Sequence, residues 1–433
     1  MLTRSQATIG EIKRETQGPA FLDRLARTIV TTAFSRIQRG RLTVATDGEI
    51  ESFGSTTGDC QLDVTLRIRD SRAWRAIAFG GTVGAGESYG RGWWSASDLI
   101  ELIRVIIDNE AAMMALDSGW GRIMSPINRL RHWLSRNTRA GSRRNIAAHY
   151  DIGNDFYRLW LDETMAYSSG VFERPESTLS EASVAKFDRI CRKLRLSPAD
   201  RVIEIGTGWG GFAIHAAREY GCHVTTSTIS RAQYQSACER VTAAGLTDRV
   251  TVLSKDYRDL EGVFDKLVSI EMIEAIGWQQ FDTFFGKCAS LLAPQGEACI
   301  QAIVIGDRHY EAAKRDVDFI KRHIFPGSCI PSIGALARSI ATSSDLTMSH
   351  LEQFGTHYAR TLRCWRDRLN AHSDEARRLG LSEEFLRLWE FYLCYCEGGF
   401  AERRLDVVQM LLKKPRNTTP ALLPALEQDA WRP

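Results

Sequence analysis

The chain has 433 residues, 44% of them hydrophobic and 25% charged, and 56 Lys and Arg against 53 Asp and Glu give a net charge of +3. This composition is typical of a globular protein of two or three domains and excludes disordered, collagen-like and coiled-coil classes. It also argues against a dedicated nucleic-acid binder, because such domains are strongly basic.

The first residues, MLTRSQATIGEIKRET, contain no apolar core of a signal peptide. No stretch approaches the ~18–20 apolar residues that a membrane span requires. The ten cysteines include no CxxC pair, so we expect reduced thiols in a cytoplasmic protein, and we expect no metal site.

The first unit, residues 1–130, is predicted to be a small α+β domain. An apolar repeat of three to four residues over 21–37 predicts a helix, and a similar pattern over 97–116 predicts another. Between them the alternating runs RLTVAT, QLDVTLRIRD and WRAIAF predict strands joined by hairpins, for example at Asp47-Gly48. Residues 80–94 are dense in glycine and end in Trp93-Trp94, two side chains that suit either a lipid interface or a core.

A basic linker is predicted over residues 131–146, where the sequence reads RHWLSRNTRAGSRR without a clean period. Two interpretations stay open for it. It is either a solvated tether or a surface patch that faces anionic lipid.

Residues 147–415 are predicted to form an α/β domain with a mostly parallel sheet and helices on both faces, because strands and helices alternate there. From residue 335 to about 412 helical patterns dominate, and residues 416–433 form a tail. Strands are predicted at 201–205, 223–226, 250–253, 266–270 and 297–305, and helices at 181–194, 211–219, 231–244 and 279–292.

The most informative local motif is VIEIGTGWGG at residues 202–211, an apolar strand followed by a glycine-rich turn and a helix. Its glycines, Gly206, Gly208 and Gly210, let the backbone turn sharply and approach a ligand closely. The GxGxG spacing departs from the GxGxxG of dinucleotide sites, and with Glu204 it fits S-adenosylmethionine better. A purely structural glycine turn is the alternative. The second strand ends in TTSTIS, which places the ribose contacts on Thr228, Ser230 and Gln233.

Several further segments occur together in a specific order: AHYDIGNDFYRLWLDETMAYSSGVF, TISRAQ, DYRDL, SIEMIEAIG, FGTHYARTL and FYLCYCEGGFAERRLDVVQ. With the glycine motif they resemble the cyclopropane-fatty-acyl-phospholipid synthase family and its mycolic acid cyclopropane synthase relatives, over about residues 140–412. The first domain, through LTVATDGEIESFG and GGTVGAGESYGRGWW, resembles the N-terminal lipid-associated domain of the phospholipid-acting members.

The resemblance implies a Rossmann-like class I methyltransferase domain that binds S-adenosylmethionine. In the family, the cofactor methyl adds to a cis double bond of an acyl chain, and a base, bound bicarbonate in the phospholipid-acting members, removes a proton so that a cyclopropane ring closes. It further implies a cytoplasmic protein, peripherally associated with the inner face of the membrane, acting on unsaturated phospholipids and forming a homodimer.

Site residues follow from the same resemblance. The cofactor residues are Tyr167, Ser168, Glu204, Gly206, Gly208, Gly210, Thr228, Ser230, Gln233, Tyr257 and Arg258, and the catalytic residues are Ser169, Glu274, Gln301, Ile303, Tyr358 and Cys396. All of these catalytic residues except Cys396 match the positions that hold bicarbonate in the family. Three positions depart from the family: Ser169 replaces a cysteine, Ala275 a histidine and Gln301 a histidine. Glutamine hydrogen-bonds an anion but cannot share a proton as histidine does, so these changes weaken the case for bicarbonate.

The leading hypothesis is methyl transfer to unsaturated acyl chains of phospholipids, with a cyclopropane ring as the usual product. An alternative keeps the substrate but gives a methyl-branched, methylene or rearranged unsaturated chain. A catalytically inactive lipid-binding protein and a small-molecule methyltransferase are two further alternatives. Cys396 is either chemical or a packing residue, and Phe391, Tyr392 and Tyr395 fit a core better than an acyl tunnel.

Overall fold

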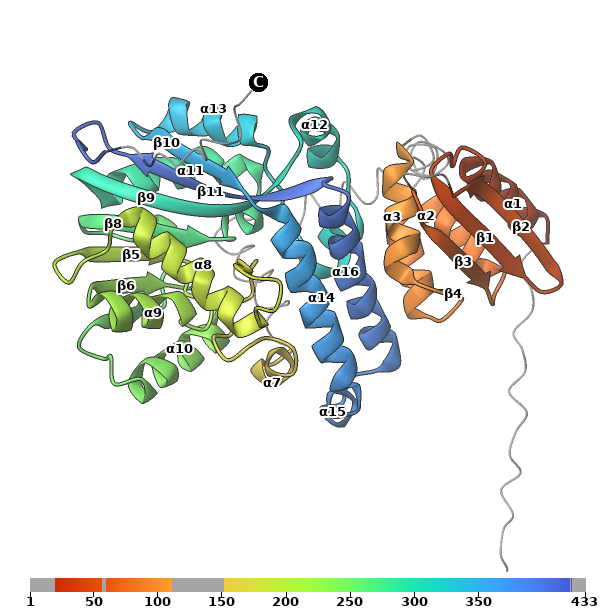
Figure 1. Ribbon diagram of the computed structural model, residues 1–433, viewed down its shortest axis with the longest axis horizontal. Helices are drawn as coiled ribbons and strands as arrows, with labels where there is room; N and C mark the ends of the chain where they lie inside the picture. Colours follow the sequence, from red (N-terminus) through yellow and green to blue (C-terminus); the bar gives the residue numbers. More distant parts are fainter. Residues whose placement is uncertain (1–19, 57–59, 111–151, 421, 423–433) are drawn as a thin grey trace, which may run out of the picture.

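The computed structural model describes residues 20–56, 60–110, 152–420 and 422 (Figure 1). They contain a four-stranded sheet, with the order β2-β1-β3-β4, and a seven-stranded sheet, with the order β10-β11-β9-β8-β5-β6-β7. The predicted linker 131–146 and most of the predicted tail 416–433 lie outside the described residues. No helix within the described ranges is long and apolar enough to cross a membrane.

The small sheet belongs to the first unit, which mixes helices and strands as predicted. Arg41–Asp63 and Arg27–Glu49 ion pairs tie its elements together. Its elements are α1 (Ala20–Phe34), β1 (Gly40–Thr46), β2 (Glu49–Ser55), β3 (Asp63–Ile68), α2 (Arg72–Gly90), β4 (Trp94–Ala96) and α3 (Leu99–Asp108). The predicted helix 97–116 is confirmed over Leu99–Asp108, and its residues 111–116 lie outside the described residues.

The predicted strand at WRAIAF is wrong, because these residues lie in α2. Trp74, Ile77 and Ala78 are the buried residues of this run, and this three-to-four spacing marks one face of a helix rather than an alternating strand. The glycine-dense stretch that follows continues α2, with a single non-helical residue at Gly81. Trp94 is buried in the core, whereas the Trp93 ring lies under the guanidinium of Arg72.

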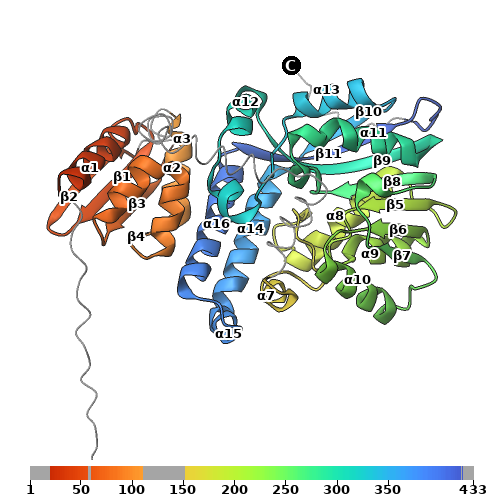
Figure 2. The ribbon, with the colours of Figure 1, turned by 180° about the vertical axis from the view of Figure 1, so that it is seen from behind.

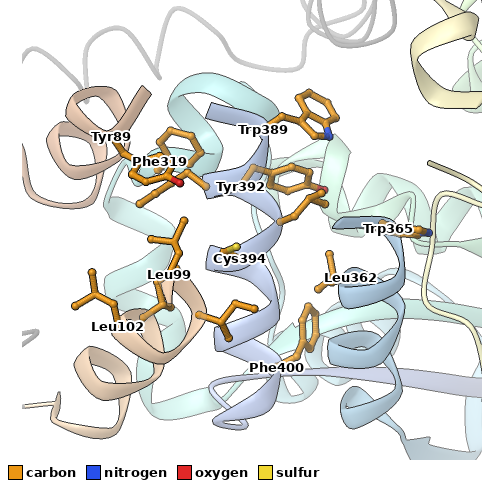
Figure 3. Close-up of a cluster of buried hydrophobic side chains, with 14 of the residues drawn as sticks. Tyr89, Leu99, Leu102, Phe319, Leu362, Trp365, Trp389, Tyr392, Cys394 and Phe400 are labelled. Atoms are coloured by element: carbon orange, nitrogen blue, oxygen red, sulfur yellow. The ribbon is translucent and has the colours of Figure 1, made fainter. Parts of the chain in front are cut away.

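The first unit docks on the second through glycine-mediated helix packing (Figures 1 and 2). α2 and α3 pack against α16 (Glu383–Ala401). A Cβ atom added at Gly86 of α2 would lie 2.3 Å from the Phe319 ring, and one at Gly398 of α16 would lie 2.5 Å from Ile103 of α3. The helices therefore approach more closely than larger residues would allow. Figure 3 shows the resulting apolar cluster, in which α16 lies between α3 and α14 (Gly355–Ala371).

The large sheet confirms the predicted mostly parallel α/β fold. β5 pairs in parallel with β6 and β8, β6 with β7, and β8 with β9. The core strands are β5 (Arg201–Ile205), β6 (His223–Ser227), β7 (Val250–Leu253), β8 (Phe264–Ile270) and β9 (Leu292–Ile305). The helices of this domain are α7 (Asn154–Arg158), α8 (Leu179–Leu194), α9 (Gly211–Tyr220), α10 (Arg231–Ala243), α11 (Phe281–Leu291), α12 (Asp307–Arg315), α13 (Ile333–Ser343) and α15 (Ser373–Arg378), besides α14 and α16.

The sequence pattern missed two strands in the region predicted to be helical after residue 335. β11 (Leu405–Lys413) pairs antiparallel with β9, and β10 (Thr347–Gln353) pairs antiparallel with β11 at the edge of the sheet. β11 has a continuous buried run from Val407 to Leu412, because it is covered on both faces. A short apolar run of that kind carries no period that separates a strand from a buried helix.

Alternate residues of the strands enter two separate cores, which shows that both faces of the sheet are covered. Ile203, Leu267 and Ile300 pack in one core with Phe284 and Phe285 of α11. Val202, Val268 and Cys299 pack in the other with residues of α8 and α9. The carboxyl ends of the parallel strands are thus held rigidly at one edge, where the glycine motif lies.

Candidate active site

The glycine motif lines a pocket of about 190 Å³ at the carboxyl edge of the sheet. Gly206 and Gly208 have positive φ angles of 103° and 52°, which L side chains rarely adopt. A Cβ atom at Gly208 would meet nothing within 4 Å, whereas one at Gly206 would lie 3.2 Å from Met272. The bare backbone of this loop therefore forms a wall that a ligand can approach closely.

Most of the predicted cofactor residues meet in this pocket. Gly210 and Ser230 do not line it: Gly210 is the N-cap of α9, and the Ser230 hydroxyl accepts a hydrogen bond from the Gln233 backbone N–H as the N-cap of α10. Thr228 donates to the Gln233 side chain at 2.9 Å, which orients that amide. The predicted residues that line the pocket are Tyr167, Ser168, Glu204, Gly206, Gly208, Thr228, Gln233, Tyr257 and Arg258.

The charges of the pocket suit a cation better than a phosphate. Arg258 is paired with the Asp256 carboxylate at 2.6 Å, so its charge is compensated within the chain. Glu204 and Glu271 contribute carboxyl groups to the lining, and Lys255, the other basic residue there, is exposed to solvent. The residues thus fit the positively charged sulfonium and amino groups of S-adenosylmethionine, which has no phosphate.

Lys186 is a buried residue that the sequence analysis missed. Its ammonium donates to the Ser168 hydroxyl at 2.6 Å, next to the pocket. Burial lowers its pKa to about 8, against the attraction of the Glu271, Asp162 and Glu204 carboxyls. Burial likewise raises the pKa of Glu204 to about 8, although the Thr226 hydroxyl donates to it. Lys186 lies in a helix of ordinary amphipathic pattern, so nothing in the sequence singled it out.

A second and larger cavity, of about 1000 Å³, adjoins the first. It lies between the two units, and its lining is largely apolar, from Phe34, Ile77 and Ile103 of the first unit to Leu362 and Phe400 of the second. The side chains of Phe391, Tyr392 and Tyr395 line it too, so these residues belong to both core and cavity wall. The two cavities share the lining residues Tyr167, Glu271, Ala275, Phe325 and Ser328.

Three of the groups predicted to hold bicarbonate converge on a carboxylate of the chain itself. The Ser169 backbone N–H donates to Glu271 Oε1 at 2.9 Å, and the Gln301 amide donates to the same oxygen at 2.7 Å. The Tyr358 hydroxyl also hydrogen-bonds the Glu271 carboxylate. Burial raises the pKa of Glu271, while Lys186 and these three donors oppose the rise.

A chain of amides fixes the direction in which Gln301 donates. The Lys193 ammonium, which can only donate, gives a hydrogen bond to Gln409 Oε1 at 2.6 Å. The Gln409 amide nitrogen therefore faces Gln301 Oε1, at 2.9 Å, and the Gln301 amide nitrogen faces Glu271. Gln301 lines neither cavity, and it acts on the site only as this oriented donor.

The remaining two predicted ligands pair with each other. The Ile303 backbone N–H donates to Glu274 Oε1, and Glu274 Oε2 is buried without a hydrogen-bond partner. Burial raises the pKa of Glu274 to about 8, and the neighbouring Glu271 adds to the rise. Glu274 lies in the 3₁₀ turn Ile273–Ile276 after β8 and lines the large cavity.

Glu271 is the principal residue that the sequence analysis missed, although it stands in the quoted segment SIEMIEAIG. It directly follows β8, and its φ of 48° is strained for a residue with a side chain. An acidic residue at the carboxyl end of a parallel strand was the available signal. Its convergence with Ser169, Gln301 and Tyr358 depends on contacts distant in sequence.

Cys396 lines the large cavity from α16. Burial raises the pKa of its thiol well above the ordinary value, so it is not held as a thiolate nucleophile at neutral pH. The structure thus places it in the wall of the apolar cavity. All ten cysteines of the chain are free.

Comparison with known proteins places the chain among lipid-modifying methyltransferases. The model of the mycolic acid cyclopropane synthetase family matches residues 137–410. The tuberculostearic acid methyltransferase UfaA1 of Mycobacterium tuberculosis (strain ATCC 25618 / H37Rv) is 37% identical over 372 residues, which is 84% of this chain and 86% of that protein. The cyclopropane-fatty-acyl-phospholipid synthase of Escherichia coli (strain K12) is 33% identical over 359 residues, 81% of this chain and 87% of that protein.

A solved structure of a relative agrees with the fold of the large domain. The mycolic acid cyclopropane synthase CmaA1, complexed with SAH and CTAB, superposes with a TM-score of 0.59 at 31% identity, over 63% of this chain and 98% of that chain. The superposed share of this chain is about the same length as the range that the family model matches.

Proposed function

The chain belongs to the mycolic acid cyclopropane synthetase family, and on that premise we propose that it transfers a methyl group from S-adenosylmethionine to the double bond of an unsaturated acyl chain of a membrane phospholipid. As a member of this family it is an S-adenosylmethionine-dependent methyltransferase. One observation carries the proposal: the cofactor pocket and a large apolar cavity meet at a wall that contains Glu271 and Tyr167.

Bicarbonate does not fit the groups that the family resemblance assigned to it. Ser169, Gln301 and Tyr358 already donate to Glu271, and Ile303 already donates to Glu274. An added anion here would lie beside the ionised Glu271, which would repel it and which already occupies the donors. We therefore assign the role of the base to Glu271 and derive no step through bicarbonate.

Each group of the chain has a definite task in this reaction. When bound, S-adenosylmethionine supplies an electrophilic methyl group, and an alkene carbon that accepts it leaves positive charge on its neighbour. The ionised Glu271 carboxylate faces this charge, stabilises it, and accepts one proton from the methylated chain, which restores a neutral product. The apolar wall excludes water that would otherwise add to the cation.

We favour a methyl-branched or methylene product that keeps one double bond over a cyclopropane. Three hydrogen bonds and Lys186 stabilise the ionised Glu271 and oppose the rise in its pKa that burial causes, which makes it a weaker base than an equally buried carboxylate without these contacts. When the base removes the proton more slowly, a hydride shift can first move the positive charge to a neighbouring carbon of the acyl chain. The product also varies among relatives, since they include a tuberculostearic acid methyltransferase and a hydroxymycolate synthase as well as cyclopropane synthases.

Analysis of the lipids of a bacterial host that expresses the protein tests this proposal. We expect phospholipid acyl chains that gain one CH₂ by mass spectrometry and that ozone still cleaves. Chains that gain one CH₂ but resist ozone contain the ring and contradict the proposed product. No modified chain at all would favour the lipid-binding alternative.

A pair of substitutions at Glu271 tests its role as the base. Glu271→Gln keeps the shape but removes the charge, so we expect product formation to fall ~100-fold or more, with cofactor affinity nearly unchanged by calorimetry. Glu271→Gly suits the positive φ angle and frees the three donors for an added anion. We expect bicarbonate or formate to restore activity in the glycine variant only. Full activity of Glu271→Gln would exclude Glu271 as the base.

A further inference from the structure

A cluster of charged side chains lies at the open end of the large cavity. Arg308 and His309 belong to α12, Arg404 precedes β11, and Glu110 follows α3, and all four line the cavity. The Arg308 side chain is 78% exposed and that of Glu110 is 41% exposed, whereas Glu274 at the other end is buried. The cavity therefore runs from this mouth at the surface to the reactive carboxyls inside.

The two arginines of the mouth share a neutral histidine. Arg308 Nε donates to His309 Nε2 at 2.7 Å, and Arg404 Nη1 donates to the same nitrogen. A ring nitrogen that accepts hydrogen bonds carries no proton, and burial and the two arginines lower the pKa of His309. Glu110 is 3.3 Å from Arg404 and 3.9 Å from Arg308. Two guanidinium groups thus face the Glu110 carboxylate with one net positive charge, while Asp316, Asp318 and Lys321, which also line the cavity, lie on the segment after α12 and carry one net negative charge.

The other charged residues of the mouth lie on the segment after α12. The Lys321 ammonium donates to the backbone carbonyls of Ala313 and Asp316, and the Lys321 backbone N–H donates to the Asp318 carboxylate at 2.9 Å. Through these contacts the Lys321 ammonium is held by backbone carbonyls, and the residue is buried. The exposed donors at the mouth are therefore chiefly those of Arg308, with Arg404 beneath it.

We propose that Arg308 and Arg404 bind the phosphodiester of a glycerophospholipid whose acyl chain enters the cavity. This inference rests on the proposed function and adds the group that recognises the substrate. A planar guanidinium group binds two phosphate oxygens in a bidentate geometry. The contacts of Glu110 with Arg404 and Arg308, at 3.3 and 3.9 Å, are long, so a phosphate that binds at hydrogen-bond distance can replace them. At ~30 Å³ for each water-sized group, the cavity of about 1000 Å³ has room for more than one eighteen-carbon chain, which favours a diacyl lipid over a free fatty acid.

Substrates with and without phosphate test the site. Dioleoylphosphatidylglycerol, dioleoylglycerol and oleate are presented as minor components of neutral detergent micelles, and methyl transfer from labelled S-adenosylmethionine is measured. We expect the wild type to prefer the phospholipid. In Arg308→Gln we expect KM for the phospholipid to rise about tenfold, as for the loss of one charged hydrogen bond, with KM for dioleoylglycerol unchanged.

Arg315→Gln is the matched control, because Arg315 is an exposed arginine of the same helix that pairs with Glu311 and does not line the cavity. Arg404→Lys serves as a second variant that keeps the charge but loses the planar geometry, and we expect an intermediate KM. Equal KM values for Arg308→Gln and Arg315→Gln, or equal use of dioleoylglycerol and phospholipid by the wild type, would overturn the site but leave the proposed function standing. Failure of the wild type to methylate any of the three lipids would instead overturn the proposed function.

Discussion

Glu271 and Glu274 are two carboxyl groups in contact with one cavity, and their surroundings separate their charge states. Glu271 receives three hydrogen bonds and the attraction of Lys186, whereas Glu274 receives one from the Ile303 backbone and leaves Oε2 unpaired. Burial raises the pKa of Glu274, and because two neighbouring carboxylates repel each other, the ionised Glu271 raises it further. We infer that Glu271 carries the charge and that Glu274 holds a proton at neutral pH, so only Glu271 is ready to accept one.

The raised pKa of Glu274 predicts a dependence of stability on pH. Its pKa rises from the ordinary 4.5 to about 8, so between these values the folded protein holds a proton that the unfolded chain releases. The stabilising contribution is complete below about pH 4.5 and is lost as the pH rises through 8. Glu274→Gln cannot ionise, so we expect its melting temperature to gain on that of the wild type as the pH increases.

Thermal unfolding of both proteins from about pH 5 to 9 measures this difference, at roughly 1.4 kcal/mol for each unit of pKa shift. Glu204 and Lys186, which also have shifted pKa values, are present in both proteins and cancel in the comparison. A difference that is constant with pH would mean that Glu274 titrates at its ordinary pKa.

At the scale of elements, the helices α2 and α16 decide how the first unit sits on the second. Tyr89 of α2 donates to the Glu390 carboxylate of α16 at 2.7 Å, and Arg387 donates to the Tyr89 carbonyl at 2.8 Å. These polar contacts surround the glycine contacts described above. A glycine-rich sequence thus encodes close helix packing here, although glycine weakens the helix itself.

Gly86→Ala is predicted to destabilise the protein by about 1–3 kcal/mol, because its Cβ would lie 2.3 Å from the Phe319 ring. Gly80→Ala is the control, since Gly80 adjoins the non-helical Gly81 and a Cβ there meets nothing within 4 Å, and we expect it to change the stability by less than about 0.5 kcal/mol. Melting temperatures of the two variants check this contrast. A neutral Gly86→Ala would show that α2 and Phe319 separate readily.

At the scale of the whole molecule, the large cavity belongs to neither unit alone. Phe34, Leu66 and Ile77 come from the first unit, and Tyr358 and Cys396 come from the second. One hydrophobic cluster likewise runs through both units (Figure 3). The first unit is therefore a structural part of the acyl cavity as well as a candidate surface for contact with lipid.

Filling the cavity from the first unit is predicted to change the preferred chain length. Ile77→Trp adds bulk to the wall, so we expect preference to shift from eighteen-carbon to sixteen-carbon chains by about tenfold, as two methylene groups contribute ~0.8 kcal/mol each. Ile50→Trp is the control, because Ile50 is 75% exposed on the same domain. Competition between the two lipids in one assay measures the ratio. An unchanged ratio in Ile77→Trp would mean that the acyl chain does not reach the first unit.

The sequence by itself determined the alternation of strands and helices, the glycine loop and most residues of the cofactor pocket, because these depend on local periodicity and on motifs of contiguous residues. It misassigned WRAIAF, whose helical spacing resembles alternation over six residues. It missed β11, because a strand buried on both faces has no distinctive period, and it missed β10, an edge strand that has no fully buried residue and so no clear alternation. Only the tertiary structure showed that Ser169, Gln301 and Tyr358 converge on Glu271 and that Arg308, Arg404 and Glu110 meet at one mouth. Those arrangements join segments 30 to 300 residues apart, and their distances follow from the packing of the sheet and of the two units rather than from any local pattern.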